Sequence, residues 1–378
     1  MEHLVPWLTL KSVPGIGNLL FRRLINFFGT PERVLKASRH RLGHVEGITS
    51  RLATAICRHR TPDSIYREID AIARSKFRVL TQKDEAYPQL LLHIPDPPPV
   101  LYLHGRLQTS ACHIAVVGSR MATAYGRTTT RRLCEQLVDH GMVITSGMAR
   151  GIDTCAHEGA LAAGGRTVAV LGSGLMRIYP PENRKLFDRI AENGAVLSEF
   201  PLNAGPDAAH FPQRNRIISG MCLGTLVVEA ARRSGSLITA RLAAEQGRDV
   251  FAIPGSIQAQ TARGTHHLIQ QGAKLVQSAR DIVEELEPQM AQPRKSRRDG
   301  SAIEASSDLD LTESEARVME AMGPYSVHID ELARRLDQPP GCLAATLSLL
   351  ELKGMVVQEA GKIFYRDRQS LGKSAIDD

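Results

Sequence analysis

The sequence lacks any cysteine pair at metal-ligand or redox spacing, and it lacks a long apolar run. Its six cysteines stand far apart: Cys57, Cys112, Cys134, Cys155, Cys222 and Cys342. This spacing argues against both a disulfide framework and a zinc site. No uninterrupted apolar run approaches the roughly 20 residues of a membrane span, and the first residues lack the order of a secretory signal. We expect no metal, no membrane partner and a cytoplasmic location.

Aromatic residues are also scarce, at 4% of the chain. This scarcity argues against a module built mainly on base-stacking platforms. Charge is plentiful but uneven: 47 Lys and Arg oppose 40 Asp and Glu, a formal net charge of +7. Residues 1–76 contain thirteen of the basic and six of the acidic residues, which accounts for the whole excess. A basic terminal segment on a neutral body indicates an anionic polymer as partner.

At 378 residues the chain is too long for one ordinary domain. Residues 1–76 contain two glycine turns, in "SVPGIGNLL" and "HVEGITSRL", each placed directly before an amphipathic helix. We predict a small helical domain of helix-hairpin-helix type, whose turns either face a DNA phosphate or serve only as turns. The prolines of residues 77–109 favour an extended connector into the next domain.

From residue 110 to 287 the hydrophobic pattern changes. Seven apolar segments alternate with helix-sized ones: "CHIAVVG", "MVITSG", "RTVAVLG", "AVLSEF", "GTLVVEA", "DVFAIPG" and "AKLVQS". Strands of that apolar density indicate a parallel sheet covered on both faces. We predict an α/β fold with a doubly wound, Rossmann-like parallel sheet.

The last part of the chain is predicted as a linker and a third domain. Residues 288–308 are polar and apolar-poor, which is typical of a flexible linker. Residues 309–370 follow the winged-helix order of three helices and a short hairpin, and Thr312 with Glu315 forms a capping-box start. In the third-helix segment only Lys353 is basic, so reading of a DNA groove is not favoured. Contact with DNA and contact with protein both stay open for this domain.

Cations, glycines and hydroxyls gather where the predicted strands end. In an open parallel sheet, ligands bind at the carboxyl ends of the strands, near the point where strand order reverses. Glycines allow close backbone approach, helix N-termini attract anions, and the arginine fork fits phosphate. We predict an anion site from these residues: Gly118, Ser119, Arg120, Ser146, Gly147, Arg150, Gly151, Lys185, Arg214, Asn215 and Arg216. The alternative for any one arginine is an internal ion pair with Asp153, Glu199 or Glu229. Which of Arg214 and Arg216 faces the ligand stays open, and Ile217 and Ile218 are expected to begin a buried helix.

A cofactor and a catalytic set are not predicted. "VVGSRMATAYG" lacks the GxGxxG spacing, and the second strand ends in "SGMARG" instead of a ribose-binding acid. No Ser/His/Asp or Cys/His set can be assembled, and His157 lies within a helical segment as a structural residue. Phe211 either stacks on a base or packs in the core.

The motifs, taken in order, resemble the DNA processing protein A family (DprA, also called Smf). They are GSR (118–120), SGMARGID (146–153), YPPEN (179–183), SEFP (198–201), FPQRNRIISG (211–220), VVEAARRSGSLITA (227–240) and VFAIPG (250–255). The resemblance implies an N-terminal sterile-alpha-motif-like domain, an extended Rossmann domain that dimerises and carries a single-strand site, and in many members a winged helix. It further implies a non-enzymatic protein that binds incoming single-stranded DNA in natural transformation, protects it and loads the recombinase RecA. By the same resemblance Arg120 is the first phosphate contact, and Arg184 or Lys185 is the second.

Two other classes of function are weighed against this one. "GTLVVEA" faintly resembles the PGGxGTxxE motif of lysine-decarboxylase-like phosphoribohydrolases, with Glu229 as the catalytic acid, but "MCLGT" lacks the PGG. A duplex-binding transcription factor that uses the winged helix is the third possibility.

Overall fold

The computed structural model describes residues 2–108, 111–290, 312–322, 327–336, 338–353, 355–359 and 362–366. The chain divides into two compact units, residues 1–294 and 295–378, and each is described by itself. Of the predicted linker, residues 288–290 belong to the last helix of the first unit, and residues 291–308 lie outside the described residues.

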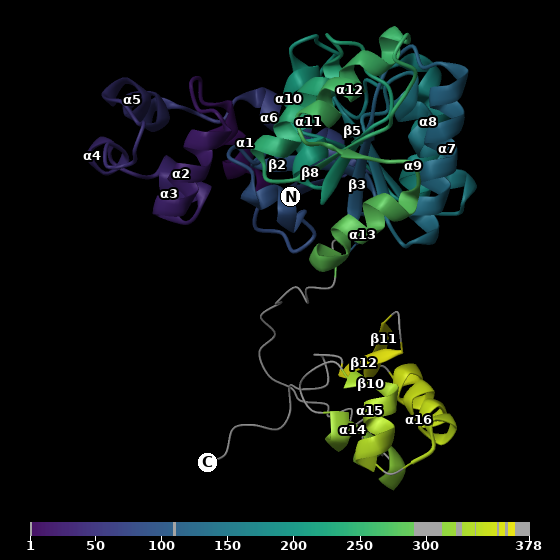
Figure 1. Cartoon of the computed structure of the whole chain (residues 1–378). Coiled ribbons are helices and arrows are strands. Elements are labelled where there is room, and N and C mark those ends of the chain that lie inside the picture. The colour runs from purple at the N-terminus through teal and green to yellow at the C-terminus, as the bar shows by residue number, and fades with distance from the viewer. Residues whose placement is uncertain are drawn as a thin grey trace, which may run out of the picture. The chain divides into compact units, whose positions relative to one another are not determined.

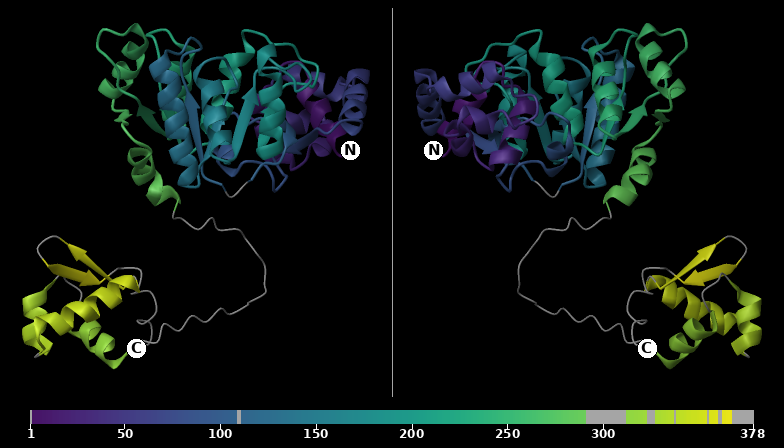
Figure 2. Two further views of the ribbon diagram at one scale, coloured as in Figure 1. Left: turned by 90° about the vertical axis from the view of Figure 1, so that its right-hand side faces the viewer. Right: turned by 90° about the vertical axis from the view of Figure 1, so that its left-hand side faces the viewer.

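The first unit begins with a bundle of short helices at one end of the sheet (Figures 1 and 2). These are α1 (Leu4–Ser12), α2 (Asn18–Phe28), α3 (Pro31–Leu35), α4 (Arg39–Leu42), α5 (Ser50–Arg58) and α6 (Asp63–Ala73). Gly15 and Gly47 form the two predicted turns with φ of +89° and +86°, a conformation that suits glycine. The first turn is exposed, and the helix that follows it is tied to the sheet, because Asn18 Nδ2 at the start of α2 donates to Glu199 Oε1 at 2.7 Å.

A nine-stranded sheet forms the centre of this unit, in the order β1-β2-β6-β5-β4-β3-β7-β8-β9. Its strands are β1 (Arg78–Thr81), β2 (Val100–Gly105), β3 (His113–Val117), β4 (Val143–Ser146), β5 (Thr167–Leu171), β6 (Ala195–Ser198), β7 (Gly224–Val227), β8 (Asp249–Ala252) and β9 (Lys274–Leu275). All seven predicted strands are present and mutually parallel, so the Rossmann-like prediction is confirmed. The segment 77–109, expected as a connector, supplies the antiparallel pair β1 and β2, and the sheet therefore starts at Arg78.

Helices cover both faces of the sheet (Figure 1). One face carries α7 (Ala124–Asp139), α8 (Ile152–Ala162), α9 (Arg184–Asn193) and α13 (Ala279–Met290), and the other carries α10 (His210–Gly220), α11 (Gly235–Glu245) and α12 (Arg263–Gln270). Strand β3 shows why both faces are apolar: Ile114 and Val116 join the core under α7 and α8, while Ala115 and Val117 join the core under α10 and α11. Short 3-10 helices occupy Gln89–His93, Pro181–Asn183 and Gln260–Ala262.

The order of strands reverses beside β3. From β3 the chain adds β4, β5 and β6 on one side, and it then returns to place β7 on the other side of β3. Val117 pairs with Val227 at the end of this junction. The loops that follow β3 and β7 therefore diverge to opposite faces, which leaves room for a ligand between them.

The second unit is a winged helix, as predicted. Its helices are α14 (Glu313–Met322), α15 (Ile329–Leu336) and α16 (Pro340–Leu352), and its strands β10 (Val327–His328), β11 (Val356–Glu359) and β12 (Ile363–Arg366) pair in the order β10-β12-β11. The capping box is present: Thr312 N donates to Glu315 Oε2 at 2.8 Å, and Glu315 N donates to Thr312 Oγ1 at 3.4 Å. Lys353 pairs with the same Glu315 carboxylate at 2.7 Å, so this cation is already neutralised within the domain.

This ion pair predicts how the winged helix responds to acid. Bonds from Lys353 and Thr312 lower the pKa of Glu315 from 4.5 to about 2. A carboxyl whose pKa is depressed by folding stabilises the native state above its unfolded pKa and loses that contribution as pH falls. We therefore expect α14 to lose protection from hydrogen exchange between pH 4.5 and 2. Mass spectrometry of α14 peptides should show a smaller loss in Glu315→Gln, and equal losses in both proteins would contradict the prediction.

Candidate nucleic-acid interface

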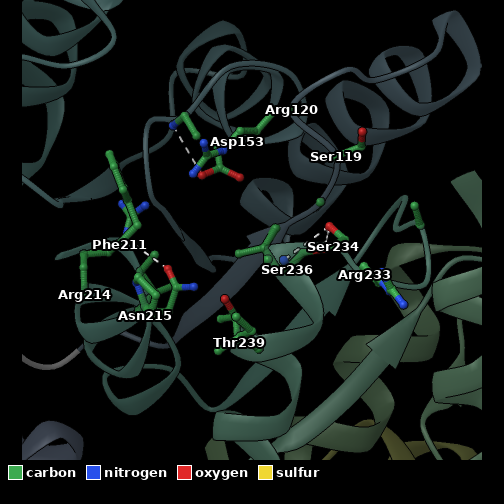
Figure 3. A pocket seen from close by; sticks show the side chains of 18 of the residues that line it. Ser119, Arg120, Asp153, Phe211, Arg214, Asn215, Arg233, Ser234, Ser236 and Thr239 are labelled. Carbon is green, nitrogen blue, oxygen red and sulfur yellow. Dashed lines mark hydrogen bonds between the residues drawn. The ribbon is translucent and has the colours of Figure 1, made fainter. Parts of the chain in front are cut away.

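A hollow of about 610 Å³ lies where the strand order reverses. The loop after β3 and the start of α8 form one side, the start of α10 forms the second, and the loop from β7 into α11 forms the third (Figure 3). Its lining residues include Gly118, Ser119, Arg120, Asp153, Phe211, Arg214, Asn215, Arg233, Ser234, Ser236 and Thr239. Five of the predicted site residues, Gly118, Ser119, Arg120, Arg214 and Asn215, are therefore brought together at one place.

Close packing of two backbone loops holds the GSR segment in position. A Cβ on Gly118 would lie 2.6 Å from Ile152 Cγ1, and a Cβ on Gly151 would lie 2.2 Å from the Ser119 carbonyl oxygen. Gly151 also has a φ of +77°. Ile152 N donates to Ser119 O at 3.1 Å. The two glycines thus let the start of α8 support the loop that carries Arg120.

Arg120 is an exposed cation of the hollow, as is Arg233. Its guanidinium carbon lies 5.2 Å from the centre of the Phe211 ring, a cation–π distance. The Phe211 ring in turn lies 5.8 Å from the ring of Tyr179, centre to centre. Among the described residues Arg120 forms no ion pair within 4.0 Å. A guanidinium without a carboxylate partner, held on an aromatic face, is available to a phosphate.

Arg214 lies in the wall of the hollow and is only 4% exposed. Its Nη1 donates to Gly147 O at 2.7 Å and also to Val170 O, and its Nε donates to Asn215 Oδ1 at 3.2 Å. Burial lowers its pKa to about 10, while the neighbouring Asp153 opposes that shift. Arg214 therefore remains charged at neutral pH and fastens α10 to the ends of β4 and β5.

Asp153 is the buried acid beneath this wall. Its Oδ2 accepts from Gly147 N at 3.1 Å and from Ala149 N at 3.3 Å. Burial raises its pKa, against the opposing effect of Arg214. The carboxyl group organises the turn after β4, so the "SGMARGID" loop is built around it.

Arg216 does not reach the hollow. It is buried, its Nη2 lies 2.6 Å from Glu199 Oε2, and its Nε lies 2.8 Å from Asp96 Oδ2. The question left open by the sequence is therefore answered by these contacts. Arg214 lines the hollow, and Arg216 forms the internal ion pair that was weighed as its alternative.

Four of the other predicted residues do not line the hollow. Ser146 is buried and donates to Val116 O at 2.6 Å, which makes it part of the sheet. Arg150 is exposed, pairs with Glu182, and lines a small adjoining hollow beside Arg120. Arg184 lines a separate groove near Lys76, and Lys185 is exposed on α9.

Seven lining residues come from a segment that was not predicted as part of the site, and four of them are polar or charged. Arg233, Ser234, Ser236 and Thr239 lie at the junction of β7 and α11. Ser234 caps α11 by accepting from Ser236 N at 3.4 Å. The signal was present as "ARRSGS", a run of cations, serines and glycine directly after a predicted strand. The rule that ligands bind at the carboxyl ends of strands, which was applied to the loop after β3, would have identified this segment after β7 as well.

The two residues considered for catalysis, Glu229 and His157, both form hydrogen bonds with neighbouring threonines. Glu229 accepts from Thr123 N at 3.0 Å and from Thr123 Oγ1 at 2.5 Å, which fixes the start of α7. His157 is buried against Thr167 Oγ1 at 2.7 Å, and burial lowers its pKa to about 3, so its ring is neutral. Over the described ranges, no group of three or more His, Cys, Asp or Glu side chains could hold a metal ion.

None of the helices that the structure describes is long and apolar enough to cross a membrane.

The fold and the hollow define a class: a doubly wound α/β protein with a cationic site at its switch point and a separate winged helix. Residues 78–287 match the family described as DNA recombination-mediator protein A, and residues 303–362 match the DprA winged helix domain. The chain belongs to the DNA recombination-mediator protein A (DprA/Smf) family.

Relatives agree with this assignment. Protein Smf of Escherichia coli is 40% identical over 79% of this chain and 80% of its own length. DNA processing protein DprA of Streptococcus pneumoniae is 47% identical over 56% of this chain and 75% of its own length. The crystal structure of the S. pneumoniae protein covers 74% of this chain and 97% of its own, with a TM-score of 0.66. DNA processing protein A from Helicobacter pylori, described for its single-stranded DNA binding mode, covers 57% of this chain and 98% of its own, with 29% identity and a TM-score of 0.52.

Proposed function

We propose that this protein binds single-stranded DNA without sequence specificity, through the hollow at the ends of β3 and β7. The observation that carries the proposal is Arg120, an exposed guanidinium without an ion-pair partner among the described residues, seated on Phe211 at the mouth of that hollow. Family membership supports the choice of DNA as the anion. The single-strand binding of the H. pylori relative supports a strand over a duplex.

The chemistry of the hollow suits a sugar-phosphate backbone. Arg120 offers a planar fork to a phosphate, and the start of α11 at Ser234 offers backbone amides and a positive dipole end. The rings of Phe211 and Tyr179 offer a surface on which a base can stack whatever its identity. Binding that depends on phosphates and stacking is independent of sequence and sensitive to salt.

The wider role is proposed from the family. The protein would protect incoming single-stranded DNA in natural transformation and load the recombinase RecA onto it, acting as a homodimer through the Rossmann-like domain and without enzymatic activity. The contacts of Glu229 with Thr123 support the non-enzymatic assignment, because they give this carboxylate a structural task. RecA loading is tested by strand exchange on DNA coated with single-strand-binding protein, with and without this protein.

The direct test is single-strand binding by Arg120→Ala. We expect its affinity for oligothymidine to fall about 5- to 150-fold, because a charged hydrogen-bond partner contributes about 1–3 kcal/mol. The slope of log affinity against log salt should also become shallower by about 0.7, the value for one phosphate contact on a single strand.

Arg131→Ala is the matched control. Arg131 is an exposed arginine paired with Glu158 at 2.6 Å, and it lies on the α7–α8 surface outside the hollow. We expect its affinity and salt slope to equal those of the unchanged protein. If Arg120→Ala and Arg131→Ala bind equally well, the hollow is not the DNA site.

A further inference from the structure

A second hollow, of about 540 Å³, lies beside the first. The start of α7, the end of β7 and the loop after β8 enclose it, with the lining residues Thr123, Tyr125, Val228, Glu229, Ile253, Pro254, Gly255, Ser256, Ala259, Thr261, Ala262 and Thr265. No step of the proposed phosphate binding uses this space. Its lining is mainly apolar around a single carboxylate.

That carboxylate belongs to Glu229, which is 5% exposed. Thr123 N and Thr123 Oγ1 each donate to one of its two oxygens. A carboxylate has about four acceptor positions, so each oxygen retains one for a ligand. A buried acceptor at the edge of an apolar hollow selects a flat, apolar group that carries an N–H donor.

An exposed aromatic ring borders the second hollow. Tyr125 is 55% exposed, and its hydroxyl donates to Pro254 O at 3.3 Å, which holds the ring beside the loop after β8. An exposed aromatic ring is a platform on which a base can stack.

The two hollows are adjacent along both strands that form them. Met121 lines the first hollow and Thr123 lines the second, and they are two residues apart, a separation of roughly 7 Å at most. After β7, Glu229 lines the second hollow and Ala231 lines the first. A strand whose phosphate rests on Arg120 can therefore place a neighbouring base in the second hollow.

We propose that the second hollow takes a nucleobase of the bound strand and prefers one with an exocyclic amino group, which donates to Glu229. This inference rests on the proposed single-strand binding and adds a base preference to it. Cytosine and thymine have similar size, but cytosine presents an N4 amino donor where thymine presents the O4 acceptor. The carboxylate accepts from the N4 amino group and repels the O4 carbonyl. The N3–H donor of thymine lies between two carbonyl oxygens that the carboxylate also repels, so cytosine is preferred.

The test compares oligodeoxycytidine with oligothymidine of equal length at neutral pH. We expect the unchanged protein to bind oligodeoxycytidine about tenfold more tightly, since a matched base contact contributes about 1–3 kcal/mol of discrimination and 1.4 kcal/mol is tenfold. Glu229→Gln should bind both oligonucleotides about equally, because its amide no longer repels the thymine O4 and its affinity for oligothymidine rises. Equal binding of both by the unchanged protein would overturn the base preference and leave the proposed function standing. Failure to bind either would overturn both.

Thr123→Ala distinguishes base recognition by Glu229 from a structural effect at the start of α7. It removes the hydroxyl that bonds to Glu229 and to Gly126 N but keeps the carboxylate. If the preference comes from base recognition, Thr123→Ala retains it, and loss of the preference in this variant would assign the effect to the start of α7. Free deoxycytidine monophosphate is the second control. It should not displace oligodeoxycytidine at equal nucleotide concentration, and displacement would make the hollow a mononucleotide site instead.

Discussion

Replacing Arg216 by alanine is expected to lower the free energy of unfolding of the sheet-containing unit by about 3–5 kcal/mol. The guanidinium lies between Glu199 and Asp96, and Glu199 is itself buried. Removing one member of a buried pair leaves the other charge desolvated and without a counter-ion, which costs more than the pair contributes. The effect should appear as reduced stability and not as a lost phosphate contact, because Arg216 lies outside the hollow.

Urea unfolding followed by tryptophan fluorescence measures this effect directly. The single tryptophan, Trp7, is buried in the N-terminal helices, where Lys11 also donates to Glu199 O at 2.7 Å. Arg131→Ala serves again as the control, because its exposed ion pair should contribute less than about 1 kcal/mol. An unfolding free energy of Arg216→Ala within 1 kcal/mol of the control would refute this account of the network.

A second large effect is expected from Gly151→Ala. The residue has φ +77° and ψ −121°, a region that is essentially restricted to glycine. The added Cβ would also lie 2.2 Å from Ser119 O and 2.7 Å from Arg120 O. Backbone strain and overpacking each contribute about 1–3 kcal/mol, so we expect a loss of about 3 kcal/mol in unfolding free energy.

Gly164→Ala is the matched comparison for this prediction. Gly164 also has a positive φ, +68°, but no heavy atom lies within 4 Å of a Cβ built there. Its expected cost is about 1 kcal/mol, from backbone strain alone. If thermal unfolding gives equal losses for the two variants, the close approach to the GSR loop contributes nothing. Single-strand affinity should fall only in Gly151→Ala, since only there is the Arg120 loop displaced.

The parallel strands could be predicted because each is an apolar run bounded by turn residues. β2 was missed although "VLYL" is just as apolar, because the prolines before it suggested an irregular connector. Its place in the sheet depends on pairing with β6, in which Tyr102 lies opposite Ser198. A contact between segments so distant in the chain has no local signature.

The site was predictable to the level of loops but not of individual side chains. The rule that ligands bind at strand ends pointed to Arg120 and to the segment around Arg214, which line one hollow in the structure. Helix α10 begins at His210, before the expected start at Ile217, so the "FPQRNR" arginines lie within it. Arg214 and Arg216 are two residues apart on a helix of 3.6 residues per turn and point to nearly opposite sides. Their partners, Gly147 and Glu199, come from distant loops, so sequence spacing could not tell the two arginines apart.

The contacts around Glu199 also determine whether the N-terminal helices could be replaced by those of another protein. Lys11 and Asn18 from the N-terminal helices bond to this one residue of the sheet unit, and Glu68 of α6 accepts from Leu202 N at 2.6 Å. In this chain, a grafted N-terminal domain would have to bring its own lysine, asparagine and glutamate at matching positions. The helical bundle and the ends of β6 and α10 therefore form one hydrogen-bonded network, which has to be exchanged as a whole.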